Sequence, residues 1–256
     1  MAKCSMNRAR IESIDLVRGI IIVIMALDHS HDFFGSLTAQ PTNTATTTTA
    51  LFFTRWVTHF CAPVFFLLTG TSASLTLKRM PKPVLSRFLA TRGLWLIFLE
   101  IVVMRFALQF NLDYHVTMLT VLWALGWAMI ALAALIWLPT WTVAAFGVIL
   151  IVGHNALDGI DASRFGAWAS LWNVLHQPGI ILNTGHSVVF VAYALIPWIG
   201  VTALGYVLGE TYRWNEDARR ALLFWLGIGL VIGFIVLAIP ISTVIRCTGS
   251  CARHRY

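Results

Sequence analysis

The sequence predicts an all-α fold, a polytopic transmembrane bundle of about seven helices with a cytoplasmic N-terminus. Hydrophobic residues make up 58% of the chain and charged residues only 11%, whereas a soluble domain is about one-quarter charged. Apolar segments long enough to cross a bilayer recur along the chain, and Lys and Arg gather in alternate connections between them. Lipid is therefore the expected solvent for most of the surface.

The predicted spans follow the apolar runs in order. The first has an intensely apolar centre, GIIIVIMAL, and the fourth carries no charge. The fifth is short for a bilayer, which a small tilt or local thinning accommodates. The last contains Pro240 near its end. The spans are 14–31, 56–77, 88–108, 116–138, 141–153, 188–208 and 221–244.

Two spans carry features that an apolar helix would not need. Pro63 interrupts the hydrogen bonds at the start of the second span, and a bend there would aim His59 inward. Charges interrupt the third span, where Glu100 lies near the bilayer centre and needs a partner. Arg105 is a candidate for that partner, although a separation of five positions suits a same-helix pair poorly.

Basic residues orient the bundle. They occupy the N-terminal arm and the connections after the second and sixth spans, which the positive-inside rule places in the cytoplasm. The net charge of +7 reflects these loops, and nucleic-acid binding is not expected. The basic residues are Lys3, Arg8, Arg10, Lys78, Arg79, Lys82, Arg87, Arg92, Arg213, Arg219 and Arg220.

The outer connections are long and different in kind. Residues 32–55 contain a threonine-rich stretch that we expect to be solvated, and 154–187 contain aromatic residues that favour a short interfacial helix. The sequence predicts one transmembrane domain over residues 8–245 and an atypical tail over 246–256. We expect a multi-pass protein of a bacterial inner membrane.

Histidines gather at the outer face of this predicted topology. Of the 8 in the chain, only His254 in the tail falls elsewhere. Solvated helix ends tolerate polar groups, so a single histidine there carries little information, whereas the group points to a site. The histidines at this face are His29, His31, His59, His115, His154, His176 and His186.

The first span carries a polar stripe along one face. Arg18 and His29 are eleven positions apart, so their directions on a helix differ by only about 20°. Asp15 and Asp32 flank the same line. A charge at mid-bilayer costs at least about 2.5 kcal/mol, so the stripe is expected to face the protein interior or a watery cavity. A merely structural pair of Asp15 with Arg18 is the alternative.

Such a stripe supports three kinds of function. A histidine near the outer face can act as a base or as an acyl carrier, oriented by Asp28 or Asp32, while inner basic groups hold phosphates of a cytoplasmic donor. The same stripe could relay protons in a coupled transporter or export component. Outer histidines could also bind a metal or haem, but His29 and His31 point to different helix faces, and we expect no metal ligands.

Several motifs in order resemble a known family. RIESIDLVRGIIIVIMALDHSHDFF and RWVTHFCAPVFFLLTGTSA are similar to the first two helices of the heparan-α-glucosaminide N-acetyltransferase catalytic-domain family, including its bacterial members. LWALGWAMIALAAL, GHNALDGI, LHQPG and YALIPWIGV also resemble its bacterial branch. The resemblance covers roughly residues 8–209 and extends to a wider group of membrane acyltransferases.

The resemblance implies transfer of an acetyl or acyl group from acyl-CoA to a sugar-like periplasmic acceptor. It implies no tightly bound cofactor, and the expected partners are the bilayer, acyl-CoA, the acceptor and further copies of the chain. Arg10, Asp15 and Arg18 would serve the donor, with Arg18 and Arg10 binding it. The catalytic set would be His29 as base or acyl carrier, Asp28 and Asp32 as orienting groups, and His59.

The chain departs from the family in two places. Animal members have their active histidine in the first lumenal loop, and no position here matches it, so His29, His31 and His59 are the nearby substitutes. The tail, TVIRCTGSCARHRY, does not resemble the family's continuation, and members have more helices than seven. The sequence therefore predicts C-terminal truncation, which leaves the activity of this chain open.

Overall fold

The computed structural model describes the backbone of residues 11–34, 47–110 and 114–253. Side chains are described over the same ranges except residues 31–32, 108–109 and 237–253. Contacts divide the chain into two units, residues 1–210 and 211–256. A single transmembrane domain over residues 8–245 stays a prediction.

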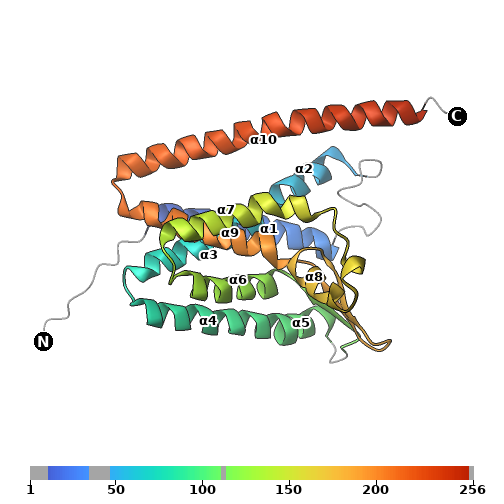
Figure 1. Ribbon diagram of the computed structural model, residues 1–256, viewed down its shortest axis with the longest axis horizontal. Coiled ribbons are helices and arrows are strands. Elements are labelled where there is room, and N and C mark those ends of the chain that lie inside the picture. The colour runs from blue at the N-terminus through green and yellow to red at the C-terminus, as the bar shows by residue number, and fades with distance from the viewer. Residues whose placement is uncertain (1–10, 35–46, 111–113, 254–256) are drawn as a thin grey trace, which may run out of the picture. The chain divides into compact units, whose positions relative to one another are not determined.

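Helices make up most of the first unit, in which α9 packs along both α3 and α7, and α6 packs against α4 (Figure 1). The second unit is a short 3₁₀ turn, Thr211–Arg213, followed by the long helix α10, Glu216–Arg253. The described helices of the first unit are α1 (Glu12–Phe34), α2 (Thr49–Thr58), α3 (Cys61–Leu77), α4 (Lys82–Phe98), α5 (Arg105–Gln109), α6 (Val121–Leu135), α7 (Thr140–His154), α8 (Ala169–Leu175) and α9 (Leu195–Glu210).

The described chain is mostly helical, as predicted, but it also contains a small sheet that the all-α prediction did not include. The order of this sheet is β1-β3-β2, with β1 (Val116–Leu119) parallel to β3 (Val188–Val191) and β2 (Gly179–Asn183) antiparallel to it. The predicted spans 116–138 and 188–208 therefore begin as strands, and α6 and α9 start only after them. Hydropathy alone cannot separate a short β-branched strand from the first turn of an apolar helix. The short helix expected in the second long connection is present as α8.

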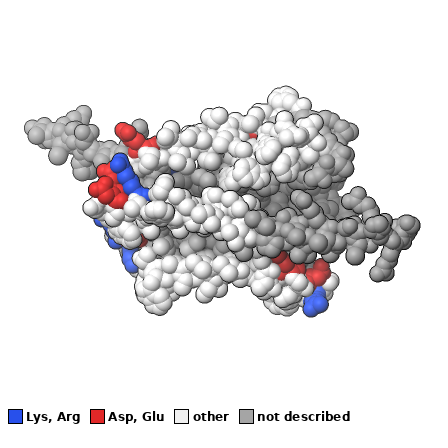
Figure 2. Space-filling view, turned by 90° about the horizontal axis from the view of Figure 1, so that it is seen from above, with Lys and Arg blue, Asp and Glu red and all other residues white. Residues whose placement is uncertain are grey.

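Three described helical segments are long and apolar enough to cross a membrane: Thr49–Leu77, Thr140–Leu157 and Glu216–Val236. The helix Val121–Leu135 is apolar but shorter. Most of the described surface seen in Figure 2 is uncharged, and the visible charged side chains gather in separate groups. These features indicate a membrane protein, while about seven spans and a cytoplasmic N-terminus stay predictions.

Glycines allow the helices of the first unit to touch backbone to backbone. A Cβ atom at Gly70 of α3 would lie 2.0 Å from the carbonyl oxygen of Thr202 on α9, and one at Gly205 of α9 would lie 2.1 Å from that of Leu67. The hydroxyl of Thr71 also donates to the Gly205 carbonyl at 3.0 Å. Small residues drive helix association where lipid removes the hydrophobic advantage of large ones. The backbones of α3 and α9 are therefore in direct contact at these glycines.

Glu100 finds its partner outside its own helix. After α4 the chain forms a π-helical turn, Leu99–Met104, before α5 continues. This turn buries Glu100 at 5% exposure, and its Oε1 accepts hydrogen bonds from the backbone N–H and the hydroxyl of Thr120, at 3.1 and 2.6 Å. The guanidinium of Arg105 lies over the ring of Tyr114, 5.1 Å from its centroid. The carboxylate thus joins the end of α4 to the start of α6.

Replacing Thr120 with Val is expected to lower stability, because the buried carboxyl of Glu100 loses a short hydroxyl donor while the side-chain volume stays similar. Hydrogen bonds to charged groups contribute about 1.5–3 kcal/mol. Thermal unfolding of the purified protein in detergent measures the effect. Thr120→Ser keeps the hydroxyl and is the control. Equal stability of the Val and Ser variants would show that this hydrogen bond contributes nothing.

Candidate active site

One face of α1 packs against α2 and α3 at seven-residue intervals. Ile14 and Ile21 are buried on this face, and the side chain of Asp28 is only 23% exposed. The thiol of Cys61 on α3 lies 3.8 Å from the carbonyl oxygen of Ile21. The predicted stripe through Arg18 and His29 does not form this contact, and its facing the protein interior or a watery cavity stays a prediction. Isoleucine side chains fill the helix contact, and the long Arg18 side chain reaches it from the flank.

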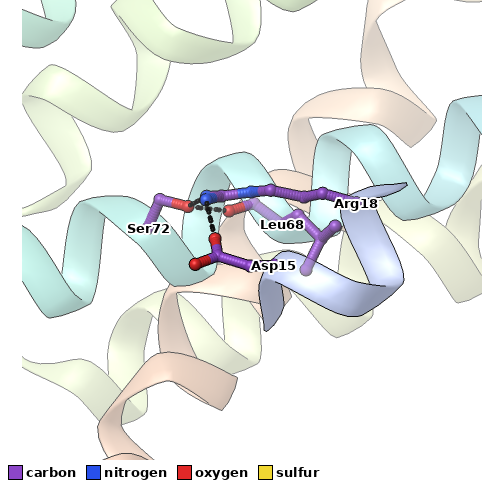
Figure 3. Close-up of polar contacts among 4 residues, drawn as sticks. All are labelled: Asp15, Arg18, Leu68 and Ser72. Carbon is purple, nitrogen blue, oxygen red and sulfur yellow. Dashed lines mark hydrogen bonds and ion pairs between the residues drawn. The ribbon is translucent and has the colours of Figure 1, made fainter. Parts of the chain in front are cut away.

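Asp15 and Arg18 form a polar contact with α3 at one end of this interface (Figure 3). An Nη of Arg18 lies 3.3 Å from Oδ1 of Asp15, and the other Nη donates to the hydroxyl of Ser72. Ser72 in turn donates to the carbonyl of Leu68. The side chains of Arg18 and Asp15 remain 41% and 51% exposed. The guanidinium is therefore oriented by its neighbours and still accessible to an anion.

Asp28 meets α2 at the other end of α1. Its Oδ1 lies 2.7 Å from an Nη of Arg55, with side-chain exposures of 23% and 36%. Two helices that are separate in sequence are thus joined by a partly buried ion pair. The sequence predicted that Arg55 lies in a loop. In the structure it belongs to α2, and its guanidinium pairs with Asp28.

His59 lies where the helix is interrupted. Helix α2 ends at Thr58 and α3 begins at Cys61, because Pro63 lacks the N–H that would bond the carbonyl four residues earlier. The helix is interrupted where the sequence predicted a bend, but the His59 side chain is exposed and does not point into the core, contrary to the expectation that the bend would aim it inward. Its Nδ1 lies 2.7 Å from the carbonyl oxygen of Arg55. A carbonyl only accepts, so Nδ1 carries a proton, and in the neutral ring Nε2 holds the lone pair.

Arg55 therefore connects two of the predicted site residues. Its guanidinium binds Asp28, and its backbone carbonyl accepts from His59. The chemical result is an imidazole with a fixed tautomer, held beside an ion pair.

Tyr193 is a further residue of this region that sequence reasoning missed. It lies between β3 and α9, and its partly buried phenol is close enough to Arg55, Asp28 and Cys61 for their charges to act on it when ionised. Its ring packs against Trp198, with centroids 5.3 Å apart. The motif YALIPWIGV contains Tyr193, and that motif was the available signal.

The remaining predicted site residues are only partly placed. His29 is exposed on α1, next to Asp28 in sequence, while the Asp28 carboxylate is engaged by Arg55. The side chains of Asp32 and His31 lie outside the described residues, as does all of Arg10. The structure thus gives contacts for Asp15, Arg18, Asp28 and His59, and it leaves the roles of all seven as predictions.

A second polar cluster joins two other outer histidines. His154 ends α7, His176 follows α8, and their Nδ1 atoms lie 3.0 Å apart. The Nε2 of His176 lies 3.3 Å from Oδ1 of Asp158. The nearby Asp161 takes no part, because its carboxylate caps the following turn, where hydrogen bonds from Ser163 lower its pKa.

The comparisons with known proteins agree with the motifs. No curated protein and no solved structure matches the chain. The family model described as heparan-alpha-glucosaminide N-acetyltransferase, catalytic, matches residues 10–240, which include both polar clusters. The chain therefore belongs to the heparan-α-glucosaminide N-acetyltransferase catalytic family and is a membrane protein of the acetyltransferase type.

Proposed function

We propose that this protein is a membrane-embedded acyltransferase that moves an acetyl or acyl group from cytoplasmic acyl-CoA to a sugar-like acceptor in the periplasm. The family match suggests the reaction class. The observation that carries the residue assignment is the contact of Arg55 with both Asp28 and His59, which leaves Nε2 of His59 as a lone-pair acceptor. A bacterial inner membrane is the proposed location.

His59 is the proposed general base. Nε2 removes the proton from the hydroxyl or amine of the acceptor as its oxygen or nitrogen attacks the thioester carbon. A C–O or C–N bond forms, the C–S bond breaks, and the proton passes from Nε2 to the departing thiolate. The Asp28–Arg55 pair holds Arg55 in place, and the Arg55 carbonyl accepts the hydrogen bond from Nδ1 of His59. His29, one residue from Asp28, is the second candidate, either as base or as acyl carrier.

Arg18 is the proposed donor-binding residue. Its guanidinium is held by Asp15 and Ser72 yet remains 41% exposed, and a fixed guanidinium suits phosphate oxygens. Arg18 and His29 are eleven residues apart on α1, so about 16 Å separates them along the helix axis. The extended arm of coenzyme A would lie along this length. Arg10, outside the described residues, is proposed as a second phosphate contact, and Asp32 as a further orienting group for His29.

The test uses membranes from cells that express the full chain, incubated with radiolabelled acetyl-CoA and a glucosamine-terminated oligosaccharide. We expect label in the oligosaccharide, loss of transfer for His29→Ala if His29 carries the acyl group, and normal transfer for His186→Ala. His186 is an exposed histidine on the β2–β3 connection. No transfer to sugar acceptors from any acyl-CoA tested would contradict the proposal. Substrate flux without acyl-CoA consumption would identify a transporter instead.

A further inference from the structure

We propose that His154, His176 and Asp158 bind a divalent transition-metal ion, of which Zn²⁺ is the best match. One donor atom from each residue lies within 4.8 Å of the donors of the other two. The site lies outside the proposed acyl-transfer residues and does not depend on that function. His154 and Asp158 are four positions apart, whereas His176 follows them by eighteen positions or more and reaches them because the residue after α8 meets the end of α7.

The buried histidine gives the strongest support. The side chain of His176 is 0% exposed, and its Nε2 makes no hydrogen bond among the described residues. Oδ1 of Asp158 lies 3.3 Å from that nitrogen. Two ligands about 2.1 Å from one tetrahedral ion are about 3.4 Å apart, so this separation suits a shared metal. A buried polar atom without a hydrogen bond is unfavourable and calls for such a partner.

The aromatic surroundings fix His176 in place. Its ring packs against Trp172 at 4.9 Å, and Trp172 stacks on Phe165 at 4.6 Å. The indole N–H of Trp172 donates to the carbonyl of Ile160 at 3.0 Å. This hydrogen bond links Trp172 to the loop that contains Asp158. Preformed ligand orientation of this kind is what a metal site requires.

The other two ligands can adjust to the ion. His154 is partly buried, and its Nδ1 faces Nδ1 of His176 at 3.0 Å. Asp158 is 63% exposed and free to rotate its carboxylate. A single ion takes one nitrogen of His176, so one of these two neighbours turns toward the ion by rotation of its side chain.

The ligand chemistry selects the metal. Two imidazoles and one carboxylate suit Zn²⁺ and its neighbours, whereas Mg²⁺ and Ca²⁺ prefer oxygen ligands alone. Three protein ligands leave the fourth tetrahedral position to water or another small ligand. The bound ion would also clamp the end of α7 to α8 across residues 155–175.

The experiment uses the full chain, purified in detergent with its affinity tag removed, stripped with EDTA and titrated with Zn²⁺. We expect about one bound zinc per chain by elemental analysis, and Co²⁺ in its place should give the visible absorption of a tetrahedral site. His176→Ala should abolish this binding. Asp158→Asn changes an exposed residue, should preserve the fold and should weaken binding at least about tenfold.

His186→Ala is the matched control, because it removes an exposed histidine from a neighbouring loop. It should leave zinc binding unchanged. The proposal is overturned if the wild-type chain binds no zinc, or if His186→Ala lowers binding as much as Asp158→Asn does. The first outcome would show that the three residues are held together by the His154–His176 contact and the His176–Asp158 pair without a metal. The second would show adventitious binding by surface histidines.

Discussion

Replacing His59 with Asn is expected to lower the rate of acetyl transfer by about two to four orders of magnitude, the usual contribution of a general base. The amide nitrogen of Asn can occupy the place of Nδ1 and still donate to the Arg55 carbonyl. The substitution therefore keeps the local hydrogen bond and removes the lone pair on Nε2. Initial rates in the radiolabel assay, at matched protein levels in the membrane, measure the loss.

Two comparisons separate catalysis from structure in this experiment. His186→Asn makes the same chemical change at an exposed histidine outside the site and should transfer at the wild-type rate. Binding of labelled acetyl-CoA to the His59 variant should persist, because Arg18 lies at the opposite end of the α1 interface. A His59→Asn protein that transfers normally would exclude His59 as the base and leave His29 as the remaining candidate.

Replacing Gly205 with Ala is expected to destabilise the first unit by about 3 kcal/mol, the upper part of the range for overpacking. The new methyl group would lie 2.1 Å from the carbonyl oxygen of Leu67, and backbone atoms cannot move aside as side chains do. For a chain of this size the midpoint of thermal unfolding should fall by roughly 6–12 °C.

Gly153→Ala is the matched control for this prediction. Both glycines lie in helices, but a Cβ atom at Gly153 would meet nothing within 4 Å. Alanine favours a helix over glycine by up to about 1 kcal/mol, so this variant should be as stable as the wild type or slightly more stable. Equal midpoints for the two variants would mean that α3 and α9 can separate without cost.

Apolar periodicity predicted much of the fold. Residues 14–31 and 141–153 are helical as expected, in α1 and α7. Apolar periodicity did not predict β1 and β3. These strands precede α6 and α9 within apolar runs that were each predicted to be one helix. Pairing between segments some seventy residues apart creates these strands, and no local window contains that information.

The candidate site was predictable only in part, for a similar reason. The sequence identified Asp28 and His59, yet their common neighbour Arg55 stood in a predicted loop. The same limit applies to His154 and His176, which were recognised as outer histidines but not as neighbours. A helix wheel shows which residues of one helix share a face, but it cannot show which residues of a neighbouring helix contact them. For α1 the helix wheel placed Arg18 and His29 on the inward face, whereas the isoleucines Ile14 and Ile21 are the residues buried there.

The interruption at His59 has a consequence for depth in the bilayer. The segment Thr49–Leu77 has 29 residues and would be about 44 Å long as one helix, whereas the hydrocarbon layer is about 30 Å thick. Helix α3 alone, with 17 residues, is about 26 Å long and nearly matches that layer. Helix α2 can then turn toward the lipid headgroups. It contains Trp56, and tryptophan is enriched at the interface between membrane and water. We therefore expect His59 to lie near the boundary between lipid and water, where the proposed sugar-like acceptor could reach it.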